Sequence, residues 1–499
     1  MHDNIENSLK RILNFVDLNP YSQTYGYADR DFWSWRTKDF NNGSFQSLIY
    51  VLACVKNLET FSGIYKKFNQ NNLIDLAYDS YKKGCFKSLE KYGSTQEAFP
   101  NEKSFCVTST LLFDLLSALK VADDIKSLSD KEKSILRNTA RFISQNIETH
   151  ANIGNHLLAS LAALGLLSQV FDFEDKKIEN GIKEIIKKLK GLWNDEGWIE
   201  EYGGADIGYL TLSLHYLTNI DEELLSEKET WIEAIIKFLS NFFHLDGSIG
   251  NFYGSRGSSI IYLSGLIQAG YKDVNDFLIQ SISNKKIPLQ NNLDDTNFSP
   301  FINSLVRGAI HLEEKSERNI NLPLKNEKYL KIFNHAGFVI IINNSTQVII
   351  DLKNSGTETI YTSTKSTKGN LPSIINKTSN DIYCAFSSEY KIVEDSKLTI
   401  SVYSEFHKVN TKPLNSLNII GSRLLIPIFN LFPFILKFGK SFLVKRFFKP
   451  GKSVGSYSKV ITIENYNYDS SDSFVIPKGY EIVSNYIHHP IKMASQNYV

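Results

Sequence analysis

The loops that precede the most apolar segments of the first 320 residues recur at a nearly constant spacing. Corresponding positions are Cys106, Asn155, Asp206 and Arg256, which are 49, 51 and 50 residues apart, and an earlier copy begins near Gln46. Each unit pairs one uniformly apolar segment with one amphipathic segment that is rich in lysine. A repeat of about 50 residues with two helices is a helical hairpin that buries its apolar helix against the neighbouring units. The period therefore predicts either an open solenoid or a closed α/α toroid with the apolar helices inside.

The composition of the recurring loops favours the toroid. They contain Gly, Asn and Asp, which are sufficient to form a turn, but also Tyr, His and Arg, which a turn does not require. In a toroid the loops that open the inner helices meet at one mouth, where such side chains can act together. We predict an α/α toroid of helical hairpins over residues 1–320.

The pattern changes from about residue 328. HAGFVIIINNSTQVIIDLKN and KLTISVYSEFHKV are rich in β-branched residues and are bounded by Asn, Ser and Gly, which is typical of strands. A chain of 499 residues is also too long for one hydrophobic core. The sequence thus predicts a multidomain α and β protein, with an antiparallel β-sandwich over residues 325–499 following the toroid.

A basic, hydrophobic insertion at 417–452 interrupts the strand pattern. Its uncharged run, LLIPIFNLFPFIL, is too short to span a bilayer and contains two prolines. The basic and aromatic residues that follow allow two interpretations: a helical insertion packed on the toroid, or a peripheral membrane contact through 424–449.

Charge and cysteine content restrict the partners and the compartment. The formal net charge is +1, so no overall positive field favours a nucleic acid, and none is predicted as a partner. The four cysteines form no CxxC pair, and the N-terminus lacks the apolar core of a signal peptide. We predict a cytoplasmic location, with the inner face of the membrane as the alternative.

Three of the recurring loops carry the candidate catalytic residues. They read NIGNH, EEYGGADIGY and DGSIGNFYGSRGS. If the toroid closes, these loops would bring an amide, an imidazole, phenols and a guanidinium into one cleft. The candidate catalytic residues are Asn155, His156, Tyr209 and Arg256.

This set of groups suits chemistry at C5 of a uronic acid. The sugar carboxylate must be neutralised before C5 can lose its proton, and Asn155 and His156 are suited to that task. Tyr209 would remove the proton, with Arg256 as the cation that lowers the pKa of the phenol. Further residues are predicted to bind the substrate, either in the loops or in the aromatic segment 25–46: Tyr202, Glu201, Asp206, Tyr253, Arg30, Trp33 and Trp35.

Each candidate also has a structural interpretation. Asn155 is equally typical of a helix N-cap, Tyr209 of a core position, and the segment 25–46 of a buried strap with internal ion pairs. The acidic residues Glu200, Glu201, Asp206 and Asp246 also leave open a glycoside hydrolase with paired carboxylates. The case for the site depends on the shared phase of its residues in the repeat.

The chain resembles the heparinase II/III-like family of polysaccharide lyases, in the branch associated with bacterial surface-polysaccharide genes. The motifs that carry the resemblance are YGYADRDFWSW, NIGNH, EEYGGADIGYLTLS and DGSIGNFYGSRGS. The resemblance implies a toroid followed by a sandwich, an Asn155–His156 pair that neutralises the substrate carboxylate, and Tyr209 as the catalytic tyrosine. Arg256 matches a motif of the biosynthetic branch.

The sequence departs from this family after Asp351, where the family's lyases carry a histidine. TSTKSTKGNLPSI stands in that place, so we predict no metal ligands and no cofactor. The predicted function is modification of an acidic polysaccharide or oligosaccharide at C5 of a uronic acid, by β-elimination or epimerisation. The alternatives are a non-catalytic binding or assembly protein of surface-polysaccharide biosynthesis, and a glycoside hydrolase.

Overall fold

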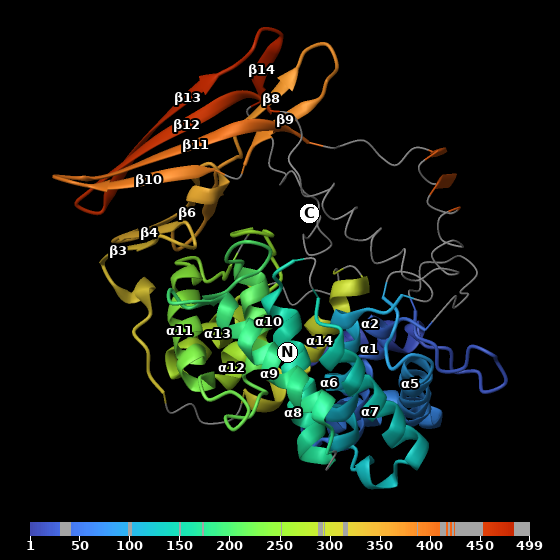
Figure 1. Ribbon diagram of the computed structural model, residues 1–499. Helices are drawn as coiled ribbons and strands as arrows, with labels where there is room; N and C mark the ends of the chain where they lie inside the picture. Colours follow the sequence, from blue (N-terminus) through green and yellow to red (C-terminus); the bar gives the residue numbers. More distant parts are fainter. Residues whose placement is uncertain are drawn as a thin grey trace.

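The chain folds into a helical N-terminal part and a C-terminal part of antiparallel sheets (Figure 1). The computed structural model describes residues 1–29, 41–97, 102–148, 151–171, 174–250, 252–287, 293, 295–312, 318–386, 388–409 and 453–483, with five residues between 416 and 424. The predicted membrane-surface segment 424–449 lies outside the described residues, apart from Leu424, and so stays a prediction. None of the helices in the described ranges is long and apolar enough to cross a membrane.

From α5 (Leu73–Glu90) to α13 (Lys272–Ser283) the described helices alternate between amphipathic and apolar ones. In chain order, the described helices are α1 (His2–Phe15), α2 (Gly43–Gln46), α3 (Ile49–Asn57), α4 (Ser62–Phe68), α5 (Leu73–Glu90), α6 (Phe105–Val121), α7 (Asp130–Gln145), α8 (Gly154–Val170), α9 (Lys176–Leu192), α10 (Ile207–Leu217), α11 (Lys228–Leu239), α12 (Leu263–Gln268), α13 (Lys272–Ser283) and α14 (Asp295–His311). The 50-residue period thus corresponds to helix pairs, as predicted.

Buried helices pack on one another in sequence order. α3 contacts α6, α6 contacts α8, α8 contacts α10, α10 contacts α12, and α12 contacts α14. α14 then packs against α1, α2 and α3, so the series of contacts returns to its starting point. The amphipathic helices lie outside this series. In α9, for example, a single apolar stripe that includes Ile178, Ile185 and Leu189 is buried.

One predicted helix is shorter than its sequence suggested. The segment SSIIYLSGLIQAG is apolar from its start at Ser258, as in the other units of the repeat, but α12 begins only at Leu263. The preceding residues are held in a non-helical conformation, because the Ser258 N–H donates to Asp206 and the Tyr262 N–H donates to Thr211 Oγ1. The β-branched pair Ile260 and Ile261 also disfavours a helix here.

Two antiparallel sheets form the C-terminal part. The five-stranded sheet has the order β3-β4-β5-β6-β7 and the larger sheet the order β13-β12-β11-β9-β8-β14, with β10 paired to β11. A two-stranded ribbon of β1 (Trp193–Asn194) and β2 (Trp198–Ile199) lies in the helical part. The strands of the two sheets are β3 (Lys328–Phe333), β4 (Phe338–Asn343), β5 (Thr346–Asp351), β6 (Thr357–Tyr361), β7 (Ser366–Lys368), β8 (Ser373–Asn376), β9 (Ile382–Ala385), β10 (Glu389–Glu394), β11 (Leu398–Lys408), β12 (Ser453–Glu464), β13 (Asn467–Val475) and β14 (Tyr480–Val483).

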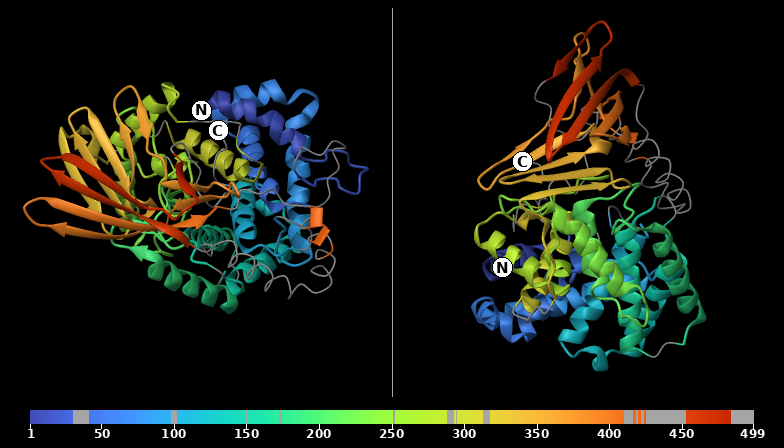
Figure 2. Two further views of the ribbon diagram at one scale, coloured as in Figure 1. Left: turned by 90° about the horizontal axis from the view of Figure 1, so that it is seen from above. Right: turned by 90° about the vertical axis from the view of Figure 1, so that its left-hand side faces the viewer.

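The five-stranded sheet lies between the helices and the larger sheet (Figures 1 and 2). Phe338 and Ile340 of β4 join the core of the helical part, whereas the alternate residues Val339 and Ile341 pack against residues of β11 and β12 such as Ile400. Since successive side chains of a strand point to opposite faces, a sheet covered on both sides needs a continuous apolar run. This explains the sequence FVIII, and it joins both parts of the chain through one shared core.

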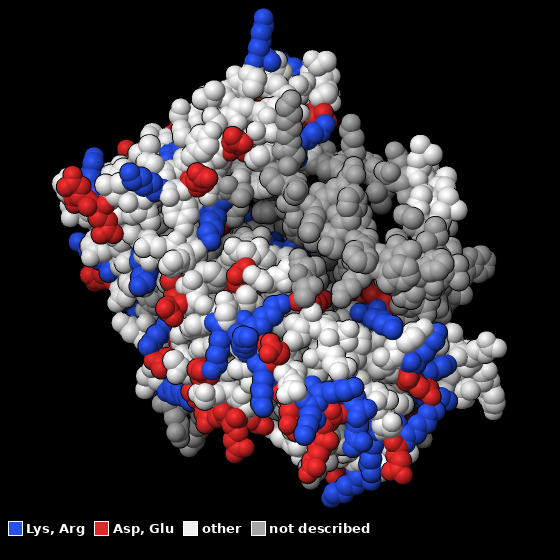
Figure 3. All heavy atoms as spheres, in the orientation of Figure 1, with Lys and Arg blue, Asp and Glu red and all other residues white. Residues whose placement is uncertain are grey.

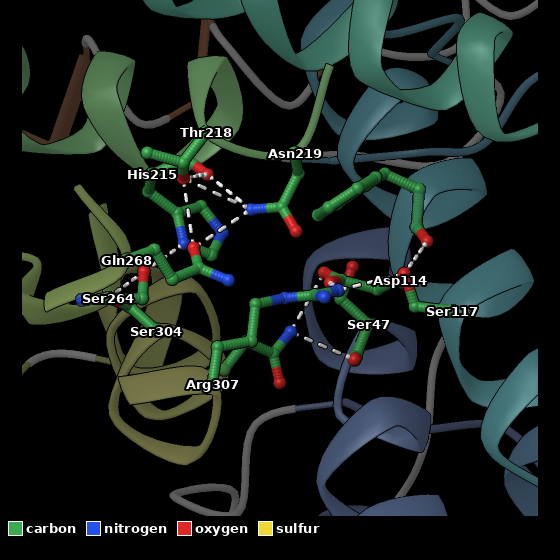
Figure 4. Close-up of polar contacts among 12 residues, drawn as sticks. Ser47, Asp114, Ser117, His215, Thr218, Asn219, Ser264, Gln268, Ser304 and Arg307 are labelled. Carbon is green, nitrogen blue, oxygen red and sulfur yellow. Dashed lines mark hydrogen bonds and ion pairs between the residues drawn. The ribbon is translucent and has the colours of Figure 1, made fainter. Parts of the chain in front are cut away.

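A buried polar network ties α14 to α6 and to Ser47, which follows α2 (Figure 4). Arg307 Nη2 lies 3.3 Å from Asp114 Oδ1 on α6 and donates to Ser117 Oγ at 2.9 Å. Asn303 Nδ2 donates to Asp114 Oδ2 at 2.8 Å and to the Ser47 carbonyl at 3.0 Å. Burial raises the pKa of Asp114 to about 6, although Arg307 and the hydrogen bonds lower it. These contacts join helices that are far apart in the sequence.

Candidate functional site

The three recurring loops that carry the predicted catalytic residues lie side by side. Ile153 bridges Glu201, and Asp206 bridges Gly254, so each loop is paired with the next. The Tyr202 N–H donates to the Asn152 carbonyl at 2.8 Å. We call the side chains Asn155, His156, Glu201, Tyr202, Tyr209 and Arg256, which these loops and the helix starts beside them carry, the three-loop cluster.

Gly254 allows the second and third loops to approach closely. Its φ is +99°, a backbone conformation that favours glycine. A Cβ atom at this position would lie 2.2 Å from the Ala205 carbonyl oxygen. The glycine in NFYGSRG is therefore required by the contact between the loops.

Asp206 fixes the geometry of the same contact. Its Oδ1 accepts from the Tyr209 N–H at 2.9 Å and caps α10, and its Oδ2 accepts from the N–H groups of Arg256 at 3.0 Å and Ser258 at 3.3 Å. Burial raises the pKa of this carboxyl to about 6, while the three backbone donors lower it. Asp206, which the sequence suggested as a substrate-binding residue, is thus engaged with the backbone on both oxygens.

Asn155 is the second residue of α8, and it is not the N-cap. That position belongs to Ile153, and no side chain caps this helix. Asn155 and Glu201 are each 3% exposed, and neither Asn155 Nδ2 nor Glu201 Oε1 has a hydrogen-bond partner of acceptable geometry. Burial raises the pKa of Glu201 to about 7, with Asp206 adding to the increase and His156 and Asn155 opposing it. Two buried polar groups therefore lie next to each other without strong partners.

His156 forms a short contact with a carboxylate that the sequence did not single out. Its Nδ1 lies 2.6 Å from Glu148 Oε2, and both side chains are mostly buried, at 18% and 14% exposed. The thiol of Cys106, near the start of α6, lies within hydrogen-bonding reach of the same ring. Burial lowers the pKa of His156, but Cys106 and Glu148 together raise it well above its ordinary value of 6.5. Glu148 and Cys106 thus favour the protonated form of the ring.

The Arg256 guanidinium stacks on Tyr202, with its Cζ 3.7 Å from the ring centroid. The sequence assigned this cation to Tyr209, whereas the structure places it over the neighbouring phenol. Burial raises the pKa of Tyr202, and His156 and Arg256 both lower it. Tyr202 also has a φ of +52°, which is rare for a bulky residue and costs on the order of 1–3 kcal/mol. Tyr202 thus keeps a strained backbone conformation with the Arg256 guanidinium stacked on its ring.

Tyr209 lies in the first turn of α10, and its side chain is half-buried against the helical core. Tyr253, predicted to bind substrate, is 4% exposed and lies at the junction with the sheets. Its hydroxyl is 2.7 Å from that of Tyr361, whose ring stacks on His244 at 3.8 Å. The predicted substrate-binding residues Arg30, Trp33 and Trp35 lie outside the described residues.

The five-stranded sheet adds charged groups that sequence reasoning did not select. Asp351 Oδ2 accepts from the Gly254 N–H at 3.3 Å, and the Lys353 ammonium lies beside Gly204. Lys368 lies 4.1 Å above the ring of Phe252, and burial lowers its pKa to about 8 while Asp351 opposes the change. The signal for Lys368 was TSTKSTKGNLPSI after Asp351, which the sequence had marked as the place of a missing histidine.

A separate cavity of about 310 Å³ lies at the opposite ends of the inner helices. Thr218 and Gln268, which follow or end α10 and α12, line it together with Lys228, Glu229 and Arg318. It shares no residue with the three-loop cluster.

On the face drawn in Figure 3, basic and acidic side chains are interspersed over the helical part without separating into regions of one sign.

Comparison with known proteins gives structural neighbours alone. No family model and no curated protein matches the sequence. A xanthan lyase of Paenibacillus is 9% identical with a TM-score of 0.44, and the match covers 82% of this chain and 45% of that one. A heparinase III is 10% identical with a TM-score of 0.38, covering 83% and 73%. A mutant heparan sulfate lyase from Pedobacter heparinus is 9% identical with a TM-score of 0.40, covering 95% and 69%.

All three are polysaccharide lyases. They belong to the class of enzyme that the sequence motifs resemble. This chain spans less than half the length of the xanthan lyase. The function proposed below rests on this chain's own residues.

Proposed function

We propose that this chain is a polysaccharide-modifying enzyme that acts at C5 of a uronic acid, by β-elimination or by epimerisation. We also propose that its helical part is an α/α toroid and its sheets a β-sandwich. The closed series of helix contacts and the apolar layer between the two sheets support this architecture. In it, the three-loop cluster lies at the end of the helical part that faces the five-stranded sheet.

The observation that carries the proposal is the pairing of buried, weakly bonded polar groups with a cation. Asn155 Nδ2 and Glu201 Oε1 have no good partner, and His156 stands beside them with a raised pKa. Burying such groups without partners is costly. A carboxylate bound here would accept hydrogen bonds from the amide, the imidazolium and the protonated form of Glu201. Those donors would stabilise the charge that develops on the sugar carboxylate when C5 loses its proton.

Proton transfer is assigned to Tyr209. In elimination the phenolate takes the C5 proton, the electron pair forms the C4–C5 double bond, and the C4–O4 bond breaks. The phenol can then return its proton to the departing O4. In epimerisation no bond to O4 breaks, and a proton returns to the opposite face of C5. Tyr202, whose pKa both His156 and Arg256 lower, is the second phenol of the cluster and is tested beside Tyr209.

The surroundings of Asp206 argue against this residue as one of the paired carboxylates of the glycosidase alternative. A catalytic carboxylate must reach the glycosidic oxygen or a water molecule. Both oxygens of Asp206 instead accept backbone hydrogen bonds that hold two loops together. Losing Asp206 would disrupt the fold of the site as much as its chemistry.

The proposal is tested by incubating the protein with a panel of acidic polysaccharides and a neutral one. We expect ultraviolet absorbance from an unsaturated uronate, or altered C5 stereochemistry, with acidic polymers alone. Asn155→Asp, which keeps the size but adds a negative charge, should abolish the activity by repelling the carboxylate. New reducing ends without unsaturation would show a hydrolase, and binding without chemistry would show an assembly protein; either result would contradict the proposal.

A further inference from the structure

His156 is held on two sides by groups of different strength. Its Nδ1 lies 2.6 Å from Glu148 Oε2, in a loop before α8. The thiol of Cys106 approaches the ring from α6. Because the carboxylate occupies Nδ1, Nε2 is the ring nitrogen that remains for other groups, the thiol among them. The ring is therefore oriented by a strong partner and covered by a weak one.

The position of Glu148 is itself fixed. Its backbone carbonyl accepts from Lys188 Nζ, on α9, at 2.5 Å. The side chain is 14% exposed, so water screens its charge little. A charge-assisted hydrogen bond in such surroundings is about twice as strong as a neutral one. Glu148 can consequently set both the orientation and the charge of the ring.

The groups that face His156 come from several elements. Glu148 and Glu201 are the carboxyls, Cys106 contributes the thiol, and Tyr202 the phenol. Arg256, stacked on Tyr202, and Lys188, beside Glu148, are the nearby cations. Burial raises the pKa of Glu201 to about 7, so near neutrality this carboxyl is partly protonated. Glu148 is therefore the carboxylate in direct contact with the ring.

We propose that Glu148 is a positioning residue that holds His156 as an imidazolium, so that its Nε2–H is ready for an anionic group of the substrate. A thiol is a weak hydrogen-bond acceptor. When substrate binds, the ring can exchange the Cys106 thiol for a carboxylate oxygen of the substrate and form a stronger, charge-assisted hydrogen bond. The inference rests on the proposed function for the identity of that anion. The protonation of the ring does not depend on it.

This arrangement specifies the direction of proton movement. An imidazolium has no lone pair with which to remove the C5 proton, so His156 acts as a donor throughout. The base must then be another group, and Tyr209 or Tyr202 remains for that role. In Glu148→Gln the ring would keep a hydrogen-bond acceptor of the same size but lose the charge that keeps it protonated.

The test is to measure the pKa of the His156 imidazole by NMR in the intact protein without substrate. An adjacent opposite charge shifts a pKa by about 1–3 units, so Glu148→Gln should lower the value by that amount. Glu148→Asp should restore part of the shift. Glu184→Gln, which removes an exposed carboxylate from α9, is the matched control and should change nothing. A pKa of His156 that is the same in wild type and Glu148→Gln would overturn the inference.

A second measurement separates this inference from the proposed function. With an acidic substrate, the KM of Glu148→Gln should exceed that of the wild-type protein at pH 8, where the His156 ring of the variant would be neutral. Near pH 5.5, where the ring of the variant would be protonated, the two KM values should approach each other. A merely structural role would raise KM equally at both pH values and would contradict the inference. If no substrate is turned over but the NMR shift is found, the proposed function fails and the role of Glu148 in holding the charge stands.

Discussion

Arg307→Met removes the cation that pairs with Asp114 inside the helical part. Arg307 is 6% exposed and Asp114 is 3% exposed, so the carboxylate left behind would be buried without its ion pair. Breaking a buried pair by removing one partner costs about 3–5 kcal/mol. Methionine retains much of the volume that packs on Tyr50 and Phe113, where the guanidinium lies 3.8 and 4.4 Å from the ring centroids. We expect the free energy of unfolding to fall by about 3–5 kcal/mol.

The loss should depend on pH in a defined direction. Asp114 has a pKa of about 6 in the folded protein, above the ordinary 3.8, and Arg307 lowers that value. Without Arg307 the folded pKa rises further, so the folded state binds a proton that the unfolded state releases. A carboxyl of this kind destabilises the fold as pH rises. The difference between variant and wild type should thus be smaller at pH 5 than at pH 8.

Denaturant unfolding of both proteins across this pH range provides the assay. Arg318→Met is the matched control, because Arg318 pairs with Glu229 at the surface and both side chains are more than a third exposed. Such a pair contributes about 0–1 kcal/mol. A loss below about 1 kcal/mol for Arg307→Met, or a loss of equal size at pH 5 and pH 8, would refute the reasoning about the buried pair.

Three further predictions concern the junction between the helices and the sheets. Burial lowers the pKa of His244 to about 3, so as pH falls the unfolded state binds a proton before the folded state does. The free energy of unfolding should therefore fall below about pH 6.5, by up to about 1.4 kcal/mol per pH unit. His244→Gln should flatten this dependence in thermal melts. Gly254→Ala combines an unfavourable φ with a clash, so it should lower the melting temperature more than Gly203→Ala does. At Gly203 φ is +92°, but no atom lies within 4 Å of the added Cβ. Equal decreases in melting temperature would rule out a contribution from the clash. Lys368→Gln should weaken the binding of an acidic oligosaccharide about tenfold in calorimetry, whereas Lys365→Gln, at an exposed position, should leave it unchanged. The affinity of the wild-type protein should decline as pH rises through about 8, where Lys368 loses its charge. Identical affinities for the two variants would exclude Lys368 from the site.

The sequence predicted the elements better than their long-range contacts. The 50-residue period placed α6, α8 and α10 because one uniformly apolar face repeats in each unit. It left open solenoid and toroid, since the choice depends on contacts such as that between Asp114 and Arg307, which are 193 residues apart. No local pattern marks such a pair.

For the candidate site, the common position of its residues within the 50-residue repeat predicted which loops meet. It did not predict what each side chain contacts. Asp206 and Asn155 stand at equivalent positions of the repeat, yet Asp206 caps its helix and Asn155 does not. The residues from outside the repeat were missed for the same reason. Glu148 and Lys368 occupy no repeated position, and their proximity to the cluster arises from tertiary packing.

Deuterium exchange at C5 tests the central claim most directly. An acidic polysaccharide is incubated in deuterated water with wild-type protein, Tyr209→Phe and Tyr202→Phe, and C5 is followed by NMR together with ultraviolet absorbance. The account predicts either deuterium at C5 or an unsaturated uronate for wild type, and neither for Tyr209→Phe. Full C5 chemistry in Tyr209→Phe, with its loss in Tyr202→Phe, would contradict the assignment of the proton-transferring phenol. Cleavage of the substrate by the wild-type protein without any change at C5 would contradict the proposed reaction itself.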